Sequence, residues 1–196
     1  ISVPYPLGEG LQLWDEFNPK RYRLEVTLET DGPGDHSQID FGLRDFGVEG
    51  RQFTINGSTT FLRGNTDCAV MPATGYAPMD VASWRKVWQT YQDFGLNMAR
   101  FHSWCPPEAA FVAANEIGIY LAPEAGEWNH IGPRRVAEQE FLREEARRIL
   151  EQFGHHPSFV MFGLGNELGG KKDYFAGLID EWRATDPARV YTIKAN

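Results

Sequence analysis

The sequence has few cysteines, no excess of positive charge and no long apolar run. Its two cysteines, Cys68 and Cys105, cannot build the disulfide framework of a small secreted domain. Lysine and arginine total 19 against 27 acidic residues, and no basic run exceeds two residues. We therefore predict no nucleic-acid partner, because binding to phosphates requires a basic face. No apolar stretch is long enough to cross a bilayer, so we also predict no membrane partner.

Residues 1–50 have the pattern of β-strands. Residues 22–29 alternate strictly between apolar and polar side chains, which is typical of a half-buried strand in an antiparallel sheet. A turn-rich stretch at 31–35 follows, and then a second strand-like run through Ile39, Phe41 and Leu43. Two or three strands cannot close a sandwich. We interpret residues 1–50 as the end of a domain whose beginning is missing, or as an arm that packs on its neighbour.

Residues 51–196 alternate between strands and helices. Asn56-Gly57 predicts a two-residue hairpin within 52–62. Strands are expected near residues 61, 97, 119, 160 and 190, with helices between them. Polar residues follow the strand ends, and in a barrel these converge on one mouth. We therefore predict an α/β fold. We favour a partial TIM (β/α)8 barrel, with about five βα units preceded by β-strands, and disfavour the alternative of a doubly wound sheet.

The predicted strand at 158–164 leads into Asn166 and Glu167. Glycoside cleavage needs a carboxylic acid that protonates the leaving oxygen, and burial at a barrel mouth raises the pKa of a carboxyl group towards that role. An adjacent asparagine can hydrogen-bond a sugar hydroxyl. The simpler interpretation is a turn asparagine followed by a glutamate that a helix N-terminus favours.

Residues 165–172 also read G-N-E-L-G-G-K-K, one residue away from the P-loop pattern G-x-x-x-x-G-K-[ST]. Lys172 replaces the hydroxyl that would hold Mg²⁺, and we disfavour a nucleotide site.

Several motifs occur in an order that resembles the family 2 glycoside hydrolases, which include β-galactosidases, β-glucuronidases and β-mannosidases. They are Phe41-Gly-Leu-Arg44, Asn56-Gly57, Leu62-Arg-Gly-Asn65, Gly95-Leu-Asn-Met-Ala-Arg100, Gly118-Ile-Tyr120, Glu124, His156-Pro-Ser158 and Gly165-Asn-Glu167. The resemblance implies that residues 1–50 are the C-terminal strands of an immunoglobulin-like β-sandwich. Residues 51–196 would then be the N-terminal part of a truncated glycosidase barrel.

The resemblance also implies roles for individual residues. Glu167 corresponds to the catalytic acid/base and Asn166 to a substrate ligand. The other expected substrate-binding residues are Arg63, Asp67, Arg100, His102, Trp104, Glu124 and Trp128. Arg100 could equally be an ion-pair partner, Glu124 a supporting charge, and Trp104 or Trp128 either sugar platforms or packing residues.

The sequence departs from the family pattern at three places. Asp67 and Cys68 stand where many members have a histidine-rich stretch. Ser103 stands where a histidine is usual, and His102 precedes it. No histidine follows Glu124 two residues later, where some β-galactosidases hold Mg²⁺. We therefore expect no metal and no cofactor.

The resemblance predicts a retaining, exo-acting β-glycosidase with a carbohydrate substrate, in the periplasm or secreted. In the family the nucleophile lies on a later barrel strand, beyond Asn196, so we expect this chain alone to be inactive. The alternative is a non-catalytic carbohydrate-binding or structural module with the same fold. An open barrel edge would also promote self-association.

Overall fold

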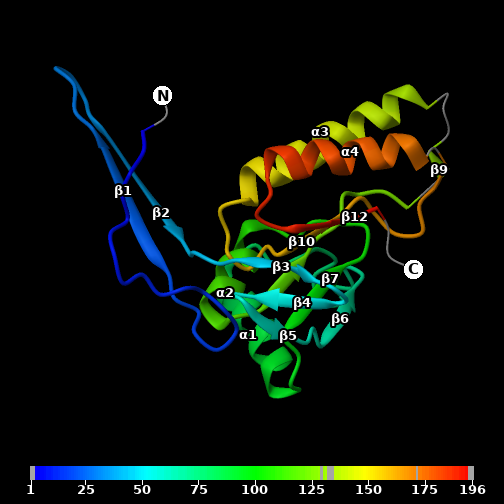
Figure 1. The fold of residues 1–196 in the computed structure, drawn as a ribbon, viewed down its shortest axis with the longest axis horizontal. Helices are drawn as coiled ribbons and strands as arrows, with labels where there is room; N and C mark the ends of the chain where they lie inside the picture. Colours follow the sequence, from blue (N-terminus) through cyan, green and yellow to red (C-terminus); the bar gives the residue numbers. More distant parts are fainter. Residues whose placement is uncertain (1–2, 129, 132–134, 171, 194–196) are drawn as a thin grey trace.

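A computed structural model describes residues 3–128, 130–131, 135–170 and 172–193 of the chain (Figure 1). Strands β1 (Tyr22–Leu28) and β2 (Asp35–Phe41) pair antiparallel and project from the body as a hairpin. The predicted strand is confirmed, but only its base is half-buried, at Tyr22 and Leu24. Farther out, Val26 and Leu28 are exposed because no other element of the described chain covers the projecting end.

A three-stranded antiparallel sheet follows, made of β3 (Phe46–Glu49), β4 (Gln52–Ile55) and β5 (Ser58–Thr60). Asn56 and Gly57 connect β4 to β5 with φ values of 52° and 78°, which is the positive-φ pair of a type I′ hairpin. The domain boundary predicted after residue 50 falls in the turn between β3 and β4, which are paired strands.

Five parallel strands form the main sheet and lie side by side in chain order. They are β6 (Gly64–Asp67), β7 (Met98–Phe101), β8 (Tyr120–Ala122), β10 (Met161–Gly163) and β12 (Val190–Thr192). Parallel bridges from Leu121 to Phe159 and from Glu124 to Gly163 join β8 to β10. The prediction of about five βα units is confirmed.

Helices connect these strands: α1 (Val81–Asp93), α2 (Glu108–Ile117), α3 (Val136–Phe153) and α4 (Lys172–Thr185) (Figure 1). Asp80 caps the N-terminus of α1, because its Oδ1 accepts a 2.8 Å hydrogen bond from the Ser83 amide. Gly118, in the left-handed conformation, ends α2. None of the helices in the described ranges is long and apolar enough to span a membrane.

Strand β3 was not predicted, and neither were two shorter strands. β9 (His130–Ile131) pairs in parallel with β11 (Gly169–Gly170). Gly169 and Gly170 thus lie in a paired strand and not in a phosphate-binding loop. This pairing argues against the P-loop alternative.

The first 50 residues are tied to the barrel by buried side chains. Trp14 is fully buried, and its indole Nε1 donates to the Asn115 carbonyl oxygen at 2.9 Å. Arg44 donates to the carbonyl oxygens of Pro157 and Phe159, which precede β10. Burial lowers the pKa of Arg44 to about 10. Residues from both predicted domains therefore share one packed region.

Candidate active site

The carboxyl ends of β7, β8 and β10 are joined by one arginine. Arg100 lies in β7, and its Nε donates to Glu124 Oε1 at 2.8 Å. Its Nη2 donates to Asn166 Oδ1, also at 2.8 Å. The structure thus brings together three of the predicted site residues at the mouth formed by the strand ends.

Glu124 is the most deeply buried carboxylate of this group, with 3% of its surface exposed. Its second oxygen, Oε2, accepts a 2.7 Å hydrogen bond from the Ser103 amide. Ser103 has a φ of 59°, so the backbone takes the left-handed conformation as it presents that N–H. A buried charge is costly unless it is paired and hydrogen-bonded. Both oxygens of Glu124 are satisfied, which makes it a fixed support rather than a free acid.

Glu167 is oriented differently from its neighbour Asn166. Asn166 is 5% exposed, whereas Glu167 is exposed and has a φ of 49°. The indole Nε1 of Trp128 donates to Glu167 Oε2 at 3.0 Å. The prediction that Glu167 is buried is wrong for this chain. The left-handed backbone at residue 167 sends the carboxyl group outwards while Asn166 turns in towards Arg100.

Three further predicted residues lie around the same mouth. The His102 ring meets Trp128 edge-on at 4.7 Å between centroids. Trp104 donates from Nε1 to the Asp67 carbonyl oxygen at 3.1 Å and packs edge-on against Phe101, so its contacts are those of a packing residue. Burial raises the pKa of the Asp67 carboxyl group, which accepts a hydrogen bond from the Ala69 amide.

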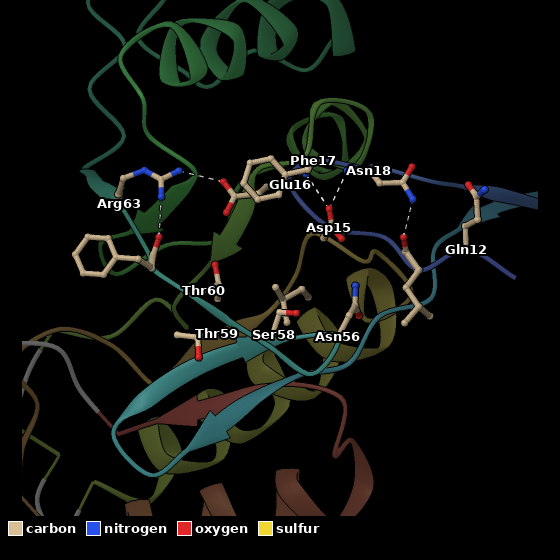
Figure 2. A pocket seen from close by; sticks show the side chains of 13 residues that line it. Gln12, Asp15, Glu16, Phe17, Asn18, Asn56, Ser58, Thr59, Thr60 and Arg63 are labelled. Carbon is tan, nitrogen blue, oxygen red and sulfur yellow. Dashed lines mark hydrogen bonds and ion pairs between the residues drawn. The ribbon is translucent and has the colours of Figure 1, made fainter.

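Arg63 does not join this group, so the prediction that it lies at the mouth is wrong. It precedes β6 and therefore lies at the amino end of the strands. Its guanidinium donates to the Gly95 carbonyl oxygen at 2.7 Å and pairs with Glu16 at 3.1 Å. Figure 2 shows it beside a pocket of about 820 Å³ between residues 12–18 and the β4–β5 hairpin. The strand expected near residue 61 begins three residues later, at Gly64. Arg63 therefore lies before the amino end of this strand and not after its carboxyl end.

The loop that supports Glu167 was not predicted from the sequence. The Asn166 amide donates to the Glu127 carbonyl oxygen at 3.2 Å, and the Ala125 amide donates to that of Gly163 at 2.9 Å. A Cβ atom at Gly165 would lie 2.0 Å from the Glu127 oxygen, so this close approach requires glycine. The glycine directly before Asn166-Glu167 was the available signal.

One cluster away from the mouth has the composition of a metal site. Ligand atoms of Glu108, His155 and His156 lie within 4.8 Å of one another. The Asn115 Oδ1 accepts from the Ser158 amide, so its Nδ2 is the donor to His156 Nδ1 at 2.7 Å. In neutral His156 the proton is then on Nε2, which leaves that nitrogen without a lone pair for a cation. The hydrogen bonds therefore disfavour a metal at this cluster.

Comparisons with known proteins agree with this architecture. The sequence model of the glycosyl hydrolases family 2 TIM barrel domain matches residues 46–196. A β-galactosidase of Lactococcus lactis is 25% identical over 186 residues, which are 91% of this chain and 18% of that protein. A β-glucuronidase of Paenibacillus borealis is 28% identical, over 94% of this chain and 34% of that protein.

Among solved structures, β-glucuronidase 3 of Bacteroides uniformis superposes with a TM-score of 0.81 at 25% identity, over 94% of this chain and 25% of that one. The chain thus spans a minor part of the length of each of these relatives. It belongs to the glycosyl hydrolases family 2, and residues 46–196 are part of that family's TIM barrel domain.

Proposed function

We propose that this chain is part of a retaining, exo-acting β-glycosidase in which Glu167 is the catalytic acid/base. One observation carries the proposal: an exposed carboxyl group follows Asn166 directly, and Asn166 is fixed by Arg100 within a buried network at the strand ends. The mouth of a TIM barrel is where enzymes of this fold place their active sites.

The chemistry assigns two roles to Glu167. In the first step its carboxylic acid protonates the glycosidic oxygen as a second carboxylate attacks the anomeric carbon and the C–O bond breaks. In the second step the Glu167 carboxylate takes a proton from water, which attacks the glycosyl-enzyme intermediate and releases the sugar.

Asn166 and Arg100 would prepare the site for a sugar. Arg100 occupies Asn166 Oδ1, which leaves the amide Nδ2 to donate to a sugar hydroxyl. Glu124 holds the Arg100 side chain in turn. In this proposal Asn166 is the substrate ligand, while Arg100 and Glu124 orient it.

The nucleophile is proposed to lie outside these 196 residues. At the described mouth the other carboxylates are already engaged: Glu124 by Arg100 and Ser103, Glu127 by the Trp128 amide, and Asp67 by the Ala69 amide. A retaining enzyme needs a carboxylate about 5 Å from the acid/base. We therefore expect residues 1–196 alone to hydrolyse no glycoside.

The decisive experiment compares the full-length parent protein with its Glu167→Gln variant on aryl β-glycosides of graded leaving-group acidity. For poor leaving groups, which need protonation, kcat/KM should fall on the order of 10²- to 10⁴-fold. For activated aryl groups it should change little. Glu151→Gln on the exposed face of α3 is the matched control and should match the parent.

Two outcomes would overturn the proposal. Unchanged kcat/KM in Glu167→Gln across the series would remove Glu167 from the mechanism. Parent protein that binds sugars but hydrolyses none of a broad panel of aryl β-glycosides would favour a non-catalytic carbohydrate-binding module. The panel also identifies the sugar, since the relatives carry the names of enzymes for different sugars.

A further inference from the structure

We propose that Trp128 is a positioning residue, whose indole N–H holds one oxygen of Glu167 and so fixes which oxygen delivers the proton. The inference rests on the proposed function, in which Glu167 is the acid/base. It replaces the sequence-based expectation that Trp128 offers a platform to the sugar.

The contact between the two side chains is direct. Trp128 Nε1 lies 3.0 Å from Glu167 Oε2. The other oxygen, Oε1, has no hydrogen-bond partner within the described ranges. Trp128 is 57% exposed, so a substrate that enters the mouth would approach the carboxyl group and the indole from the same open side.

The indole is held in place from several directions. The Trp128 amide donates to Glu127 Oε1 at 3.0 Å, and the His102 ring lies against the indole with an interplanar angle of 83°. Behind it, the Glu127 carbonyl oxygen accepts from the Asn166 amide. The loop that carries Trp128 is therefore docked on the same segment that carries Glu167, which fixes the donor relative to the carboxyl group.

The chemistry follows from the properties of indole. The Nε1–H group is a donor only and cannot accept a proton. A protonated carboxyl group therefore meets it through its unprotonated oxygen, here Oε2, and carries its own proton on Oε1. After proton transfer the carboxylate keeps the same bond through Oε2, so Oε1 is again the oxygen that receives a proton from water. One orientation then serves both steps.

Trp128→Phe tests the role because it keeps an aromatic ring and removes the donor, and a Trp→Phe control elsewhere accounts for the smaller ring. In the full-length protein we expect kcat/KM for poor leaving groups to fall about 10- to 100-fold, the effect of losing one hydrogen bond to a charged group. Activated leaving groups should be affected little. Trp88→Phe in α1 is the matched control, since its N–H donates to the Ala110 carbonyl oxygen and not to Glu167.

A sugar platform would behave differently. If Trp128 stacked on the sugar, kcat/KM in Trp128→Phe would change by the same factor for every leaving group, because all substrates in the series share one sugar. That uniform result, or no change at all, would overturn the inference.

The double variant separates this inference from the proposed function. If Trp128 acts through Glu167, adding Trp128→Phe to Glu167→Gln should lower kcat/KM for poor leaving groups by a much smaller factor than the same substitution does in the parent protein. Fully additive losses would refute the positioning role while leaving Glu167 as the acid/base. Failure of the proposed function would instead appear in Glu167→Gln alone, as kcat/KM values that match the parent.

Discussion

The Arg100 Nε atom lies 2.8 Å from a carboxylate oxygen of Glu124, which is almost completely buried. Removing a carboxylate from water costs several kcal/mol, and its attraction to a nearby guanidinium offsets that cost only where the geometry is good. Here the Ser103 amide also satisfies the second oxygen. The pair is therefore a structural requirement of the mouth as well as the support for Asn166.

Arg100→Met should destabilise the protein by about 3–5 kcal/mol, because it leaves the Glu124 carboxylate buried without its cation. Urea unfolding measures the change. Arg147→Met is the matched control, since Arg147 pairs with Glu144 and Glu151 on the exposed face of α3 and should matter little. The double variant Arg100→Met/Glu124→Gln should recover part of the loss, and a double variant less stable than Arg100→Met would contradict this account.

The elements of the barrel could be predicted because their signals are local. The Asn56-Gly57 hairpin was predicted from those two residues alone, and it connects β4 to β5. The resemblance and the strand ends placed Arg100, Glu124 and Asn166 at one mouth. Arg63 was misplaced because a strand that begins at residue 64 rather than near 61 puts it at the opposite end.

The details of the mouth could not be predicted because they depend on backbone conformations with weak sequence signals. Ser103 and Glu167 both have positive φ values, which glycine favours and serine or glutamate adopts rarely. Those conformations decide that Ser103 donates its amide to Glu124 and that Glu167 points outwards to Trp128. Only the three-dimensional packing of the loops determines them.

Gly165→Ala should destabilise the protein by about 1–3 kcal/mol, the usual cost of overpacking. The added methyl group would overlap the Glu127 carbonyl oxygen, and the loop of Trp128 must move away. Gly177→Ala is the matched control within α4, where nothing lies within 4 Å, and should stabilise by about 0.5–1 kcal/mol. Thermal unfolding of both variants tests whether Gly165→Ala lowers the stability while Gly177→Ala raises it. Equal changes in stability would contradict the close approach of Gly165 to the Glu127 carbonyl oxygen.

The stability of the protein should fall in acid because of His156. Burial lowers the pKa of His156 to about 3 in the folded chain, well below the usual value for histidine of about 6.5. Between these two pH values the unfolded chain binds the proton and the folded chain does not. This contribution to stability is therefore present above about pH 6.5 and is lost as the pH falls towards about 3, at up to about 1.4 kcal/mol per pH unit.

His156→Phe isolates that contribution. The variant should be less stable near neutral pH, because Asn115 loses its hydrogen-bond partner, but its stability should fall less steeply in acid. Urea unfolding at a series of pH values gives both slopes. Gln38→Ala, on the exposed part of β2, should keep the slope of the parent, and a His156→Phe slope equal to the parent would refute the assignment.

Residues 1–196 expressed alone should self-associate through the edges of the parallel sheet. Within the described chain, β6 pairs only with β7 and β12 only with β10, so each strand leaves one row of backbone groups unpaired. Such edges pair with other chains unless charge or cover prevents it. Thr66→Lys places a charge on exposed β6 and should raise the monomer fraction in light scattering, whereas Thr90→Lys on exposed α1 should not. If residues 1–196 without either substitution stay monomeric at high concentration, the edges of the sheet are already protected and the prediction is wrong.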